Sequence, residues 1–241
     1  MGLTVVTGGS RGIGAATALR LAREGHDLLL GYARDAAAAE ATAERARRLG
    51  VRCRAVRVDV SDPDQVDGLF DAAAEEGTIT GLVNNAGATL HLGDLADTPV
   101  DVVCRVVDVN LTGALLVARR AVRDMVDGGA IVNVSSGAAT LGAAHDYVHY
   151  AAAKAGVDAL TLGLATEVAD RGIRVNGVAP GVVRTDIHAA AGDPGRAERM
   201  ASSVPLGRAG EPEEVAEAIA WLLGDACPYV TGATLRVAGG R

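Results

Sequence analysis

Short apolar runs rich in Val, Leu and Ile alternate with longer segments of helical character along the whole chain. The strand-like runs occupy Leu3–Thr7, Asp27–Tyr32, Arg54–Val58, Gly81–Asn84, Ala130–Ser135, Arg174–Ala179 and Ala233–Val237. The helical segments between them occupy Ile13–Glu24, Ala36–Leu49, Pro63–Glu75, Val100–Val126, Tyr147–Asp170 and Pro212–Leu223. This alternation predicts an α/β, doubly wound fold, in which a seven-stranded parallel sheet with right-handed crossovers carries helices on both faces.

No linker interrupts the alternation, so residues 1–241 are expected to form a single domain. The stretch 180–210 is rich in Gly, Ala and Pro and contains no clear element. Loops of this length inside a compact domain usually carry function. We therefore expect a lid here, with a substrate pocket between the lid and residues 137–149.

The composition indicates which residues fill the core, and it argues against a nucleic-acid-binding surface and a metal site. Hydrophobic residues make up 49% of the 241 residues and aromatic residues only 2%, so Ala, Val, Leu and Ile are expected to fill the core. The net charge of −7 argues against a nucleic-acid-binding surface, which would be basic. The three cysteines, Cys53, Cys104 and Cys227, have neither CxxC nor metal-ligand spacing, so no metal site is expected.

The first residues lead directly into a strand, without the basic and apolar segments of a secretion signal. No apolar run approaches the roughly 18 residues that a membrane span requires. The expectation is a cytoplasmic protein that does not bind membranes.

The sequence TVVTGGSRGIGAAT places Gly8, Gly12 and Gly14 between the first predicted strand and the first predicted helix. Glycines allow a sharp turn and a close approach of the backbone, and a helix N-terminus offers free N–H groups and a positive dipole end. These properties suit the pyrophosphate of a dinucleotide. A P-loop does not fit, because no Gly-Lys-Ser/Thr follows.

The end of the second predicted strand indicates which dinucleotide binds. An acidic residue there would bind both ribose hydroxyls of NAD(H) and repel a 2′-phosphate. Here the strand ends at Tyr32, Arg34 follows, and the glycine turn contributes Arg11. Two guanidinium groups suit a phosphate, so NADP(H) is predicted to be preferred, with NAD(H) possible. In the alternative, both arginines are solvated surface charges and Asp35 binds the ribose.

The segment SSGAATLGAAHDYVHYAAAK, from Ser135 to Lys154, contains two serines, two tyrosines and one lysine. On a helix, Tyr150 and Lys154 share a face about 6 Å apart along the axis, whereas Tyr147 lies about 10.5 Å from the lysine. A nearby ammonium group lowers the pKa of a phenol, which is normally near 10. Tyr150 is therefore predicted to act as acid and base, with Lys154 lowering its pKa. The adjacent serines end a strand, so only one of them can face Tyr150.

The chain resembles the compact single-domain branch of the short-chain dehydrogenase/reductase family along essentially its whole length. Beyond the glycine turn, the resemblance is carried by motifs in the family's order: DVSD (Asp59–Asp62), NNAG (Asn84–Gly87), VNLTG (Val109–Gly113), IVNVSS (Ile131–Ser136), YAAAK (Tyr150–Lys154), VNGVAPGVVRTD (Val175–Asp186) and PYVTGATLRVAGG (Pro228–Gly240). The resemblance implies a Rossmann-type fold. The 3-oxoacyl carrier-protein reductases are among the members with the nearest pattern.

The resemblance also implies roles for single residues. Ser136 would donate a hydrogen bond to the substrate oxygen, while Ser135 caps or packs. Asn110 would distort the fourth helix and hold a water that supplies protons to Lys154. The implied catalytic residues are Ser136, Tyr150, Lys154 and Asn110. The implied cofactor-binding residues are Gly8, Ser10, Arg11, Gly12, Ile13, Gly14, Tyr32, Arg34, Asp59, Val60, Asn84, Ala86, Gly87, Tyr150, Lys154, Pro180, Gly181, Val183 and Thr185.

Within this cofactor set, Asp59 and Val60 would contact the adenine, and Thr185 the nicotinamide carboxamide. Asp59 is also compatible with a plain turn residue after the third strand. The histidines His145, His149 and His188 and the acidic Asp146 could contact a polar substrate, although each is more ordinarily an exposed loop or helix residue.

We interpret the chain as an oxidoreductase that transfers hydride between a nicotinamide and a carbonyl or secondary alcohol, such as an NADPH-dependent 3-oxoacyl reductase. A sugar or small-alcohol dehydrogenase of the same family is the alternative. A non-catalytic dinucleotide sensor is an alternative of another class, against which the intact set of Ser136, Tyr150 and Lys154 argues. Family members usually form dimers or tetramers through the fourth and fifth helices, so a homo-oligomer that binds a small-molecule substrate is expected.

Overall fold

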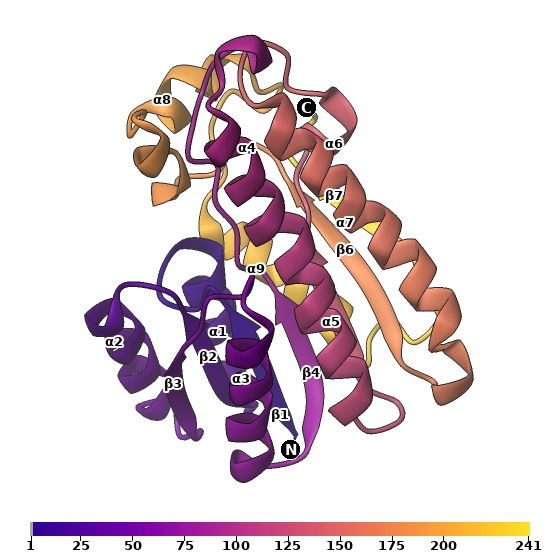
Figure 1. Cartoon of the computed structure of the whole chain (residues 1–241). Helices are drawn as coiled ribbons and strands as arrows, with labels where there is room; N and C mark the ends of the chain where they lie inside the picture. The colour runs from indigo at the N-terminus through magenta and orange to yellow at the C-terminus, as the bar shows by residue number, and fades with distance from the viewer. Residues whose placement is uncertain (1) are drawn as a thin grey trace.

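The computed structural model describes residues 2–241 and contains a parallel sheet of seven strands (Figure 1). The strands are β1 (Leu3–Thr7), β2 (Asp27–Tyr32), β3 (Cys53–Arg57), β4 (Ile79–Asn84), β5 (Ala130–Val134), β6 (Arg174–Pro180) and β7 (Thr234–Val237). Their order across the sheet is β3-β2-β1-β4-β5-β6-β7, and all neighbours are parallel. The predicted α/β fold is confirmed.

Helices cover both faces of this sheet (Figure 1). One face carries α1 (Gly12–Arg23), α2 (Ala36–Arg47) and α9 (Pro212–Leu223), and the other carries α3 (Pro63–Glu76), α5 (Gly113–Asp124) and α7 (Val148–Glu167). The helix α4 (Val100–Val107) precedes α5, and α6 (Ala138–Leu141) and α8 (Arg196–Met200) are short. Single-turn 3-10 helices occur at Leu95–Asp97, Ala169–Arg171 and Ala201–Ser203.

The side chains of β2 show why the strands appear in the sequence as unbroken apolar runs. Leu28 and Leu30 are buried in the core beneath α1 and α9, whereas Leu29 is buried in the core beneath α3. Successive side chains of a strand point to opposite faces, and both faces of this sheet are covered. A strand at this position therefore needs apolar residues without alternation.

The predicted helix Val100–Val126 requires a correction at its centre. A π-helical turn, Asp108–Thr112, separates α4 from α5. Such turns insert a residue into the α-helical hydrogen-bond ladder and occur frequently at functional sites. The periodicity of apolar residues does not reveal a local insertion of this kind.

The stretch 180–210 contains more regular structure than the sequence indicates. After β6 it forms a 3-10 helix, Asp186–Ala191, followed by α8 and the 3-10 helix Ala201–Ser203. These elements lie together above the carboxyl ends of the strands, at the upper left of Figure 1. We call residues 185–203 the lid.

Candidate active site

A cleft of about 550 Å³ opens at the carboxyl ends of the strands around β1. The chain leaves β1 toward β2 on one side, and β4 lies on the other, so the crossovers run in opposite directions from this point. Open α/β sheets bind ligands at such a switch point. The walls come from the glycine turn, the ends of β2, β3 and β4, and the start of the lid.

The glycine turn has the backbone geometry that its sequence predicts. Gly8 and Gly12 have φ of +67° and +53°, a region that favours glycine. A Cβ on Gly14 would lie 2.2 Å from the Gly8 carbonyl oxygen, so α1 can pack this closely only with glycine there. Asn85 donates to the carbonyl oxygens of Thr7 (2.9 Å) and Gly8 (3.2 Å), which holds the turn against the end of β4. The first N–H groups of α1 therefore border the cleft in a pre-formed arrangement.

Two arginines border the cleft beside the end of β2. Arg11 and Arg34 both line it, as does Tyr32. Within residues 2–241, neither guanidinium forms an ion pair. The Asp35 carboxylate accepts a hydrogen bond from the Ala38 N–H at 2.9 Å and caps α2, which gives it a structural role.

Most of the residues predicted to bind the cofactor line this one cleft: Gly8, Ser10, Arg11, Gly12, Ile13, Gly14, Tyr32, Arg34, Asp59, Val60, Ala86, Gly87 and Thr185. The structure places Asn84, Tyr150, Lys154, Pro180, Gly181 and Val183 outside its lining. Asn84 requires a correction, because its amide donates to the carbonyl oxygen of Ala114 (2.9 Å) and to Asn133 (3.1 Å) in the core. Its neighbour Asn85 lines the cleft instead.

Pro180, Gly181 and Val183 lie at the end of β6 and engage neighbouring backbone. The Pro180 carbonyl accepts from the Gly137 N–H at 2.8 Å, and the Gly181 N–H donates to Val237 at 3.0 Å. Val183 packs in the core beneath α9. These contacts set the path of the chain into the lid.

Sequence reasoning missed several residues of the cleft: Gly31, Ala33, Val58, Asn85, Ala88, Leu90, Arg105, Val109, Asp186, Ile187 and Ala189. Asp35, which the sequence offered only as the alternative ribose-binding residue, also lines the cleft. For Asn85 the NNAG motif was a usable signal. Leu90 has a φ of +60°, which its residue type does not indicate. Arg105 comes from α4, far away in the chain, so only the tertiary structure brings it to the cleft.

Tyr150 and Lys154 lie on the same face of α7 and are buried, with exposed fractions of 7% and 4%. The Lys154 ammonium is 5.8 Å from the centre of the Tyr150 ring and donates to the Val134 carbonyl oxygen at 2.8 Å. Burial raises the pKa of Tyr150, the neighbouring Tyr147 adds to this, and the Ser136 hydroxyl acts in the opposite direction. Burial lowers the pKa of Lys154 to about 8.

The expectation that Lys154 lowers the pKa of Tyr150 therefore requires a correction. The phenol packs in a small apolar cluster with Val106, Ala138 and Ala151, which disfavours the phenolate. The only cation beside it among the described residues is directed at a backbone carbonyl. Burial therefore favours the protonated form of this phenol.

The two serines at the end of β5 have different surroundings. Ser135 is buried, and its hydroxyl donates to the carbonyl oxygen of Lys154 at 3.3 Å, so it packs. The Ser136 hydroxyl is partly exposed and accepts from the Ala138 N–H at 3.1 Å. Its effect on the pKa of Tyr150 places it beside the phenol.

Asn110 connects the π-helical turn to the loop after β4. Its amide donates to the carbonyl oxygens of Ala88 (2.7 Å) and Val106 (2.8 Å), and its oxygen accepts from the Ala88 N–H at 3.2 Å. The Val106 carbonyl is the one that an uninterrupted α-helix would bond to the Asn110 backbone, so the side chain replaces a lost ladder bond. A Cβ on Gly87 would lie 2.8 Å from the Asn110 oxygen and 3.5 Å from the Lys154 nitrogen, so this packing requires glycine.

The lid contacts the residues that precede Tyr150. Arg196 of α8 pairs with Asp146 at 2.7 Å, and its guanidinium lies 5.2 Å from the centre of the Tyr147 ring. His188 stacks on Tyr147 with centroids 6.2 Å apart, and Tyr147 meets Tyr150 edge to face at 5.2 Å. Tyr147 thus connects the lid to the phenol.

Of the three histidines in this region, His145 is exposed as expected from the sequence, whereas His149 and His188 are more buried than expected. His145 is exposed and pairs with Asp94 at 2.8 Å. His149 is only 4% exposed, and neither of its ring nitrogens has a hydrogen-bond partner among the described residues. The Nδ1 of His188 is also buried without a partner within residues 2–241, and burial lowers its pKa to about 4.

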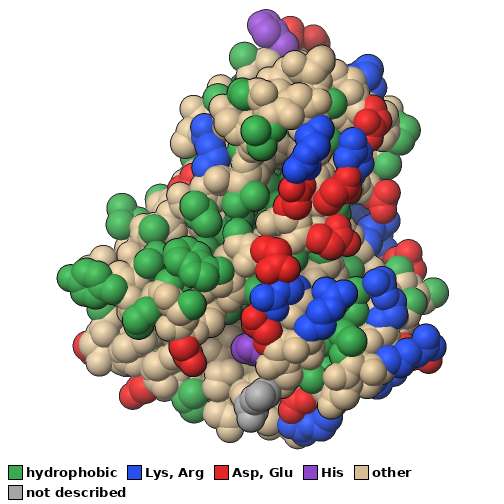
Figure 2. Space-filling model, turned by 180° about the vertical axis from the view of Figure 1, so that it is seen from behind, with side chains coloured by type: hydrophobic (Ala, Val, Ile, Leu, Met, Phe, Trp, Pro, Cys, Tyr) green, Lys and Arg blue, Asp and Glu red, His purple; other side chains and the backbone are tan. Residues whose placement is uncertain are grey.

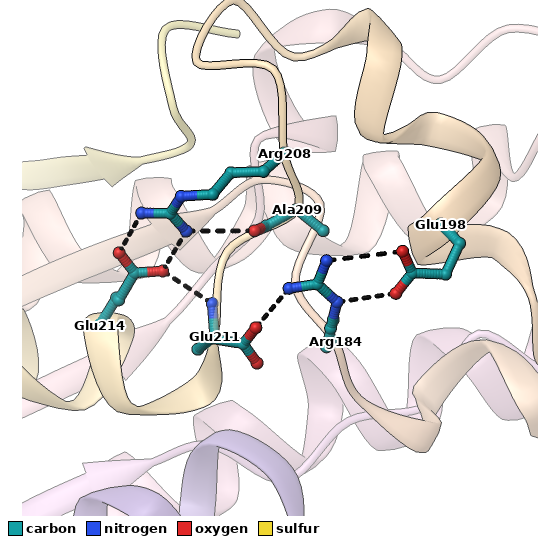
Figure 3. Close-up of polar contacts among 6 residues, drawn as sticks. All are labelled: Arg184, Glu198, Arg208, Ala209, Glu211 and Glu214. Carbon is teal, nitrogen blue, oxygen red and sulfur yellow. Dashed lines mark hydrogen bonds and ion pairs between the residues drawn. The ribbon is translucent and has the colours of Figure 1, made fainter.

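The base of the lid is anchored to the start of α9 by the ion pairs shown in Figure 3. Arg184 pairs with Glu198 of α8 at 2.7 Å and with Glu211, the N-cap of α9. Arg208 pairs with Glu214 at 2.6 Å, and Glu214 accepts from the backbone N–H of Glu211 at 2.8 Å. The lid is therefore held at its base as well as at Arg196.

Within residues 2–241, none of the helices combines the length and the apolar character needed to cross a membrane. No group of three or more His, Cys, Asp or Glu side chains in that range is arranged to hold a metal ion.

Known proteins are similar to this chain in sequence and in fold. The family described as Enoyl-(Acyl carrier protein) reductase matches residues 8–241. A short-chain dehydrogenase from Burkholderia cenocepacia J2315, solved in complex with NADP, superposes with a TM-score of 0.92 at 36% identity, covering 98% of this chain and 96% of its own. This chain belongs to the short-chain dehydrogenase/reductase family.

Relatives of known sequence agree with this assignment. The chain is 44% identical over 247 residues to the uncharacterized oxidoreductase YgfF of Escherichia coli (strain K12), covering 100% of both. It is 43% identical to 3beta-hydroxysteroid dehydrogenase 1 of Eggerthella lenta, covering 98% of this chain and 92% of that one. The resemblance predicted from the motifs is confirmed, and this short-chain dehydrogenase/reductase is an oxidoreductase.

Proposed function

We propose that this protein is an NADP(H)-dependent reductase of ketones, which runs in reverse as a secondary-alcohol dehydrogenase. The observation that carries the proposal is the convergence of Tyr150, Ser136 and Lys154 behind the wall of the cleft, where a Cβ on the lining residue Gly87 would lie 3.5 Å from the Lys154 nitrogen. A protein that only senses dinucleotides has no use for a buried proton donor beside a second hydroxyl.

The preference for NADP(H) is supported by charge at the β2 end of the cleft. Arg11 and Arg34 offer two guanidinium groups without a carboxylate partner there, and Asp35 is engaged as a helix cap. A ribose 2′-phosphate would satisfy both cations. The Burkholderia relative was solved with NADP, which agrees with this choice.

Each residue of the site has a separate role in the reduction of the substrate carbonyl. When bound, the reduced nicotinamide supplies the hydride. The Tyr150 O–H bond breaks as a new O–H bond forms on the substrate oxygen, and the raised pKa keeps that proton in place until the oxygen becomes basic. The Ser136 hydroxyl donates a hydrogen bond to the same oxygen as its negative charge grows. Tyr150 is left as the phenolate, and its burial, which raises its pKa, favours prompt reprotonation, while Lys154 keeps its hydrogen bond to the Val134 carbonyl oxygen.

The surroundings of Tyr150 support a substrate with hydrocarbon beside its carbonyl. Val106, Ala138 and Ala151 pack against the phenol, with Leu90 and Val102 at the edge of the cluster. Apolar walls favour a 3-oxoacyl group or an alicyclic ketone over a sugar, whose hydroxyls would lose their hydrogen bonds to water.

The surface supports assembly into a homo-oligomer. Figure 2 shows hydrophobic side chains gathered over one side of the rear face and charged side chains over the other. Large hydrophobic side chains are exposed on α9, on β7 and between them (Trp221, Leu235 and Tyr229), and on α7 at Leu162. Contiguous apolar surface on a folded chain commonly marks an interface. Light scattering after size-exclusion chromatography measures the mass directly.

A panel of carbonyl compounds tests the proposed activity. Loss of nicotinamide absorbance is followed with NADPH and a 3-oxoacyl thioester, an alicyclic ketone or an aldose, and with NADP and the matching alcohols. Turnover of the first two compounds is expected, and it should disappear in Tyr150→Phe. Cofactor binding without turnover in either direction would overturn the proposal in favour of a sensor.

A further inference from the structure

Arg236 lies on β7, the edge strand next to β6, and its guanidinium reaches the turn that follows Ser136. The backbone of Arg236 is in register with Ala179 of β6, so the sheet fixes the base of this side chain. The residue lies outside the lining of the cofactor cleft. Within residues 2–241 it forms no ion pair. The hydrogen bonds of its guanidinium therefore indicate its role.

The guanidinium binds the first turn of α6, a helix of only four residues. Nη2 of Arg236 donates to the carbonyl oxygen of Gly137 at 3.4 Å and to the hydroxyl of Thr140. The Thr140 hydroxyl donates to the same Gly137 carbonyl at 3.3 Å, which closes a ring of three hydrogen bonds. A single helical turn has little stability of its own, so contacts from neighbouring elements must hold it in place.

The same turn determines the orientation of Ser136. The hydroxyl oxygen of Ser136 accepts from the Ala138 N–H at 3.1 Å, and its carbonyl oxygen accepts from the Ala139 N–H at 3.1 Å. Because the hydroxyl oxygen accepts there, its proton is free to be donated to a substrate. The Gly137 N–H donates to the Pro180 carbonyl oxygen at 2.8 Å, which attaches the turn to β6 as well. The direction in which Ser136 donates therefore depends on the position of this turn.

We propose that Arg236 is a positioning residue for the hydroxyl of Ser136, and that it acts from outside the site through the first turn of α6. The inference rests on the proposed reduction of ketones. A hydrogen bond stabilises the charge that grows on the substrate oxygen only when the donor is aimed at that oxygen before the reaction. Loss of the anchor should therefore lower the rate of reduction and leave cofactor binding unchanged.

A long-range effect of the positive charge of Arg236 is the alternative explanation for a lower rate. Thr140→Val separates the two, because it removes the hydroxyl that the guanidinium binds and leaves the charge in place. Positioning predicts similar losses of rate in Thr140→Val and Arg236→Met, whereas a charge effect predicts a loss only in Arg236→Met.

The experiment is a double-mutant cycle with Ser136→Ala, measured as kcat at saturating NADPH with the ketone that the native chain reduces fastest. Arg236→Met keeps most of the side-chain length and loses the donors, so kcat is expected to fall about tenfold, as for one hydrogen bond from a charged group. On the Ser136→Ala background no hydroxyl remains to be positioned. There, Arg236→Met and Thr140→Val should each lower the residual kcat by less than about twofold. The dissociation constant of NADPH should stay native throughout.

Arg54→Met is the matched control. Arg54 lies on β3, the edge strand at the opposite side of the sheet, where it pairs with Glu75 and Glu76, so a native kcat is expected.

Circular dichroism confirms that each variant is folded, and if Arg236→Met failed to fold, Thr140→Val would carry the test alone. A native kcat in either folded variant would overturn the proposal, as would equal losses of kcat with and without the Ser136 hydroxyl. If the native chain reduced no ketone, the proposed function itself would fail, which is a different result from additive losses.

Discussion

The cofactor side and the substrate side of the site are built by different means. On the cofactor side, the glycine turn places backbone N–H groups at the cleft, and Asn85 holds that turn through two backbone carbonyls. On the substrate side, the lid is placed by side chains of α8, where Arg196 pairs with Asp146 and Glu198 pairs with Arg184. The cofactor side is therefore shaped by backbone geometry, whereas the substrate side is shaped by ion pairs between side chains.

Unfavourable features gather on the substrate side. Ala143 and His145 have φ of 49° and 63°, an unusual conformation for residues other than glycine, and Leu90, with φ of 60°, lies where the cleft meets the cluster around Tyr150. Among buried side-chain polar atoms without a partner in residues 2–241, the ring nitrogens of His149 and His188 lie here, and only the Thr17 hydroxyl lies on the cofactor side. Strain and unpaired polar groups persist where function requires them. The comparison indicates a cofactor site complete by itself and a substrate site that a ligand completes.

The largest effect is expected from removing the proton donor of the substrate side. Tyr150→Phe should lower kcat for ketone reduction by about 10³ to 10⁴, because general acid catalysis is lost. NADPH binding should persist, since the cofactor side is independent. Tyr147→Phe is the control, because its ring still packs on Tyr150 while its hydroxyl is lost. Similar losses of kcat in both variants would show that the phenol has no special role.

A change of charge on the cofactor side should alter cofactor binding separately from the substrate side. Arg34→Asp is expected to weaken NADPH binding by about 100-fold and to shift preference toward NADH, because a carboxylate repels the 2′-phosphate and accepts from ribose hydroxyls. Dissociation constants for both cofactors measure it. Arg45→Asp, an exposed change on α2 outside the cleft lining, should leave both constants near native. A native preference for NADH would contradict the assignment.

A smaller effect is expected when the lid loses its buried ion pair. Arg196→Gln should raise KM for the ketone about tenfold, because Asp146 and Tyr147 lose the charged partner that orders them. The dissociation constant of NADPH should change little. Arg199→Gln removes a neighbouring exposed pair with Asp193 and should have almost no effect on KM. Equal changes in both constants would contradict the separation of the two regions.

The smallest effect concerns stability at low pH. The pKa of His188 is about 4 in the folded chain and near 6.5 in the unfolded one, so between these values the unfolded state binds more protons. Stability should therefore fall as pH decreases from about 6.5 to 4, by about 1–2 kcal/mol after allowance for partial exposure. Urea unfolding of the native chain and His188→Gln across this range measures it. Identical slopes in the two proteins would remove His188 as the cause.

The sequence was most informative where function depends on backbone geometry or on residues close together in the chain. The spacing of Gly8, Gly12 and Gly14 predicts the glycine turn. The helical spacing of Tyr150 and Lys154 predicts that they act as a pair on one face of a helix. Asn84 was assigned to the cofactor because the resemblance implies that role for the NNAG motif, and only the tertiary structure shows that its amide is hydrogen-bonded in the core.

The succession of strands and helices along the chain and the phosphate-binding turn follow from the sequence by itself, because short-range periodicity and steric limits on glycine act within a few residues. The order of the strands across the sheet, the position of the cleft, the direction of the pKa shift on Tyr150 and the ion pairs of the lid were decided only by the tertiary structure. Burial and electrostatic contacts depend on side chains from distant segments, and these meet only after the sheet and its helices have packed.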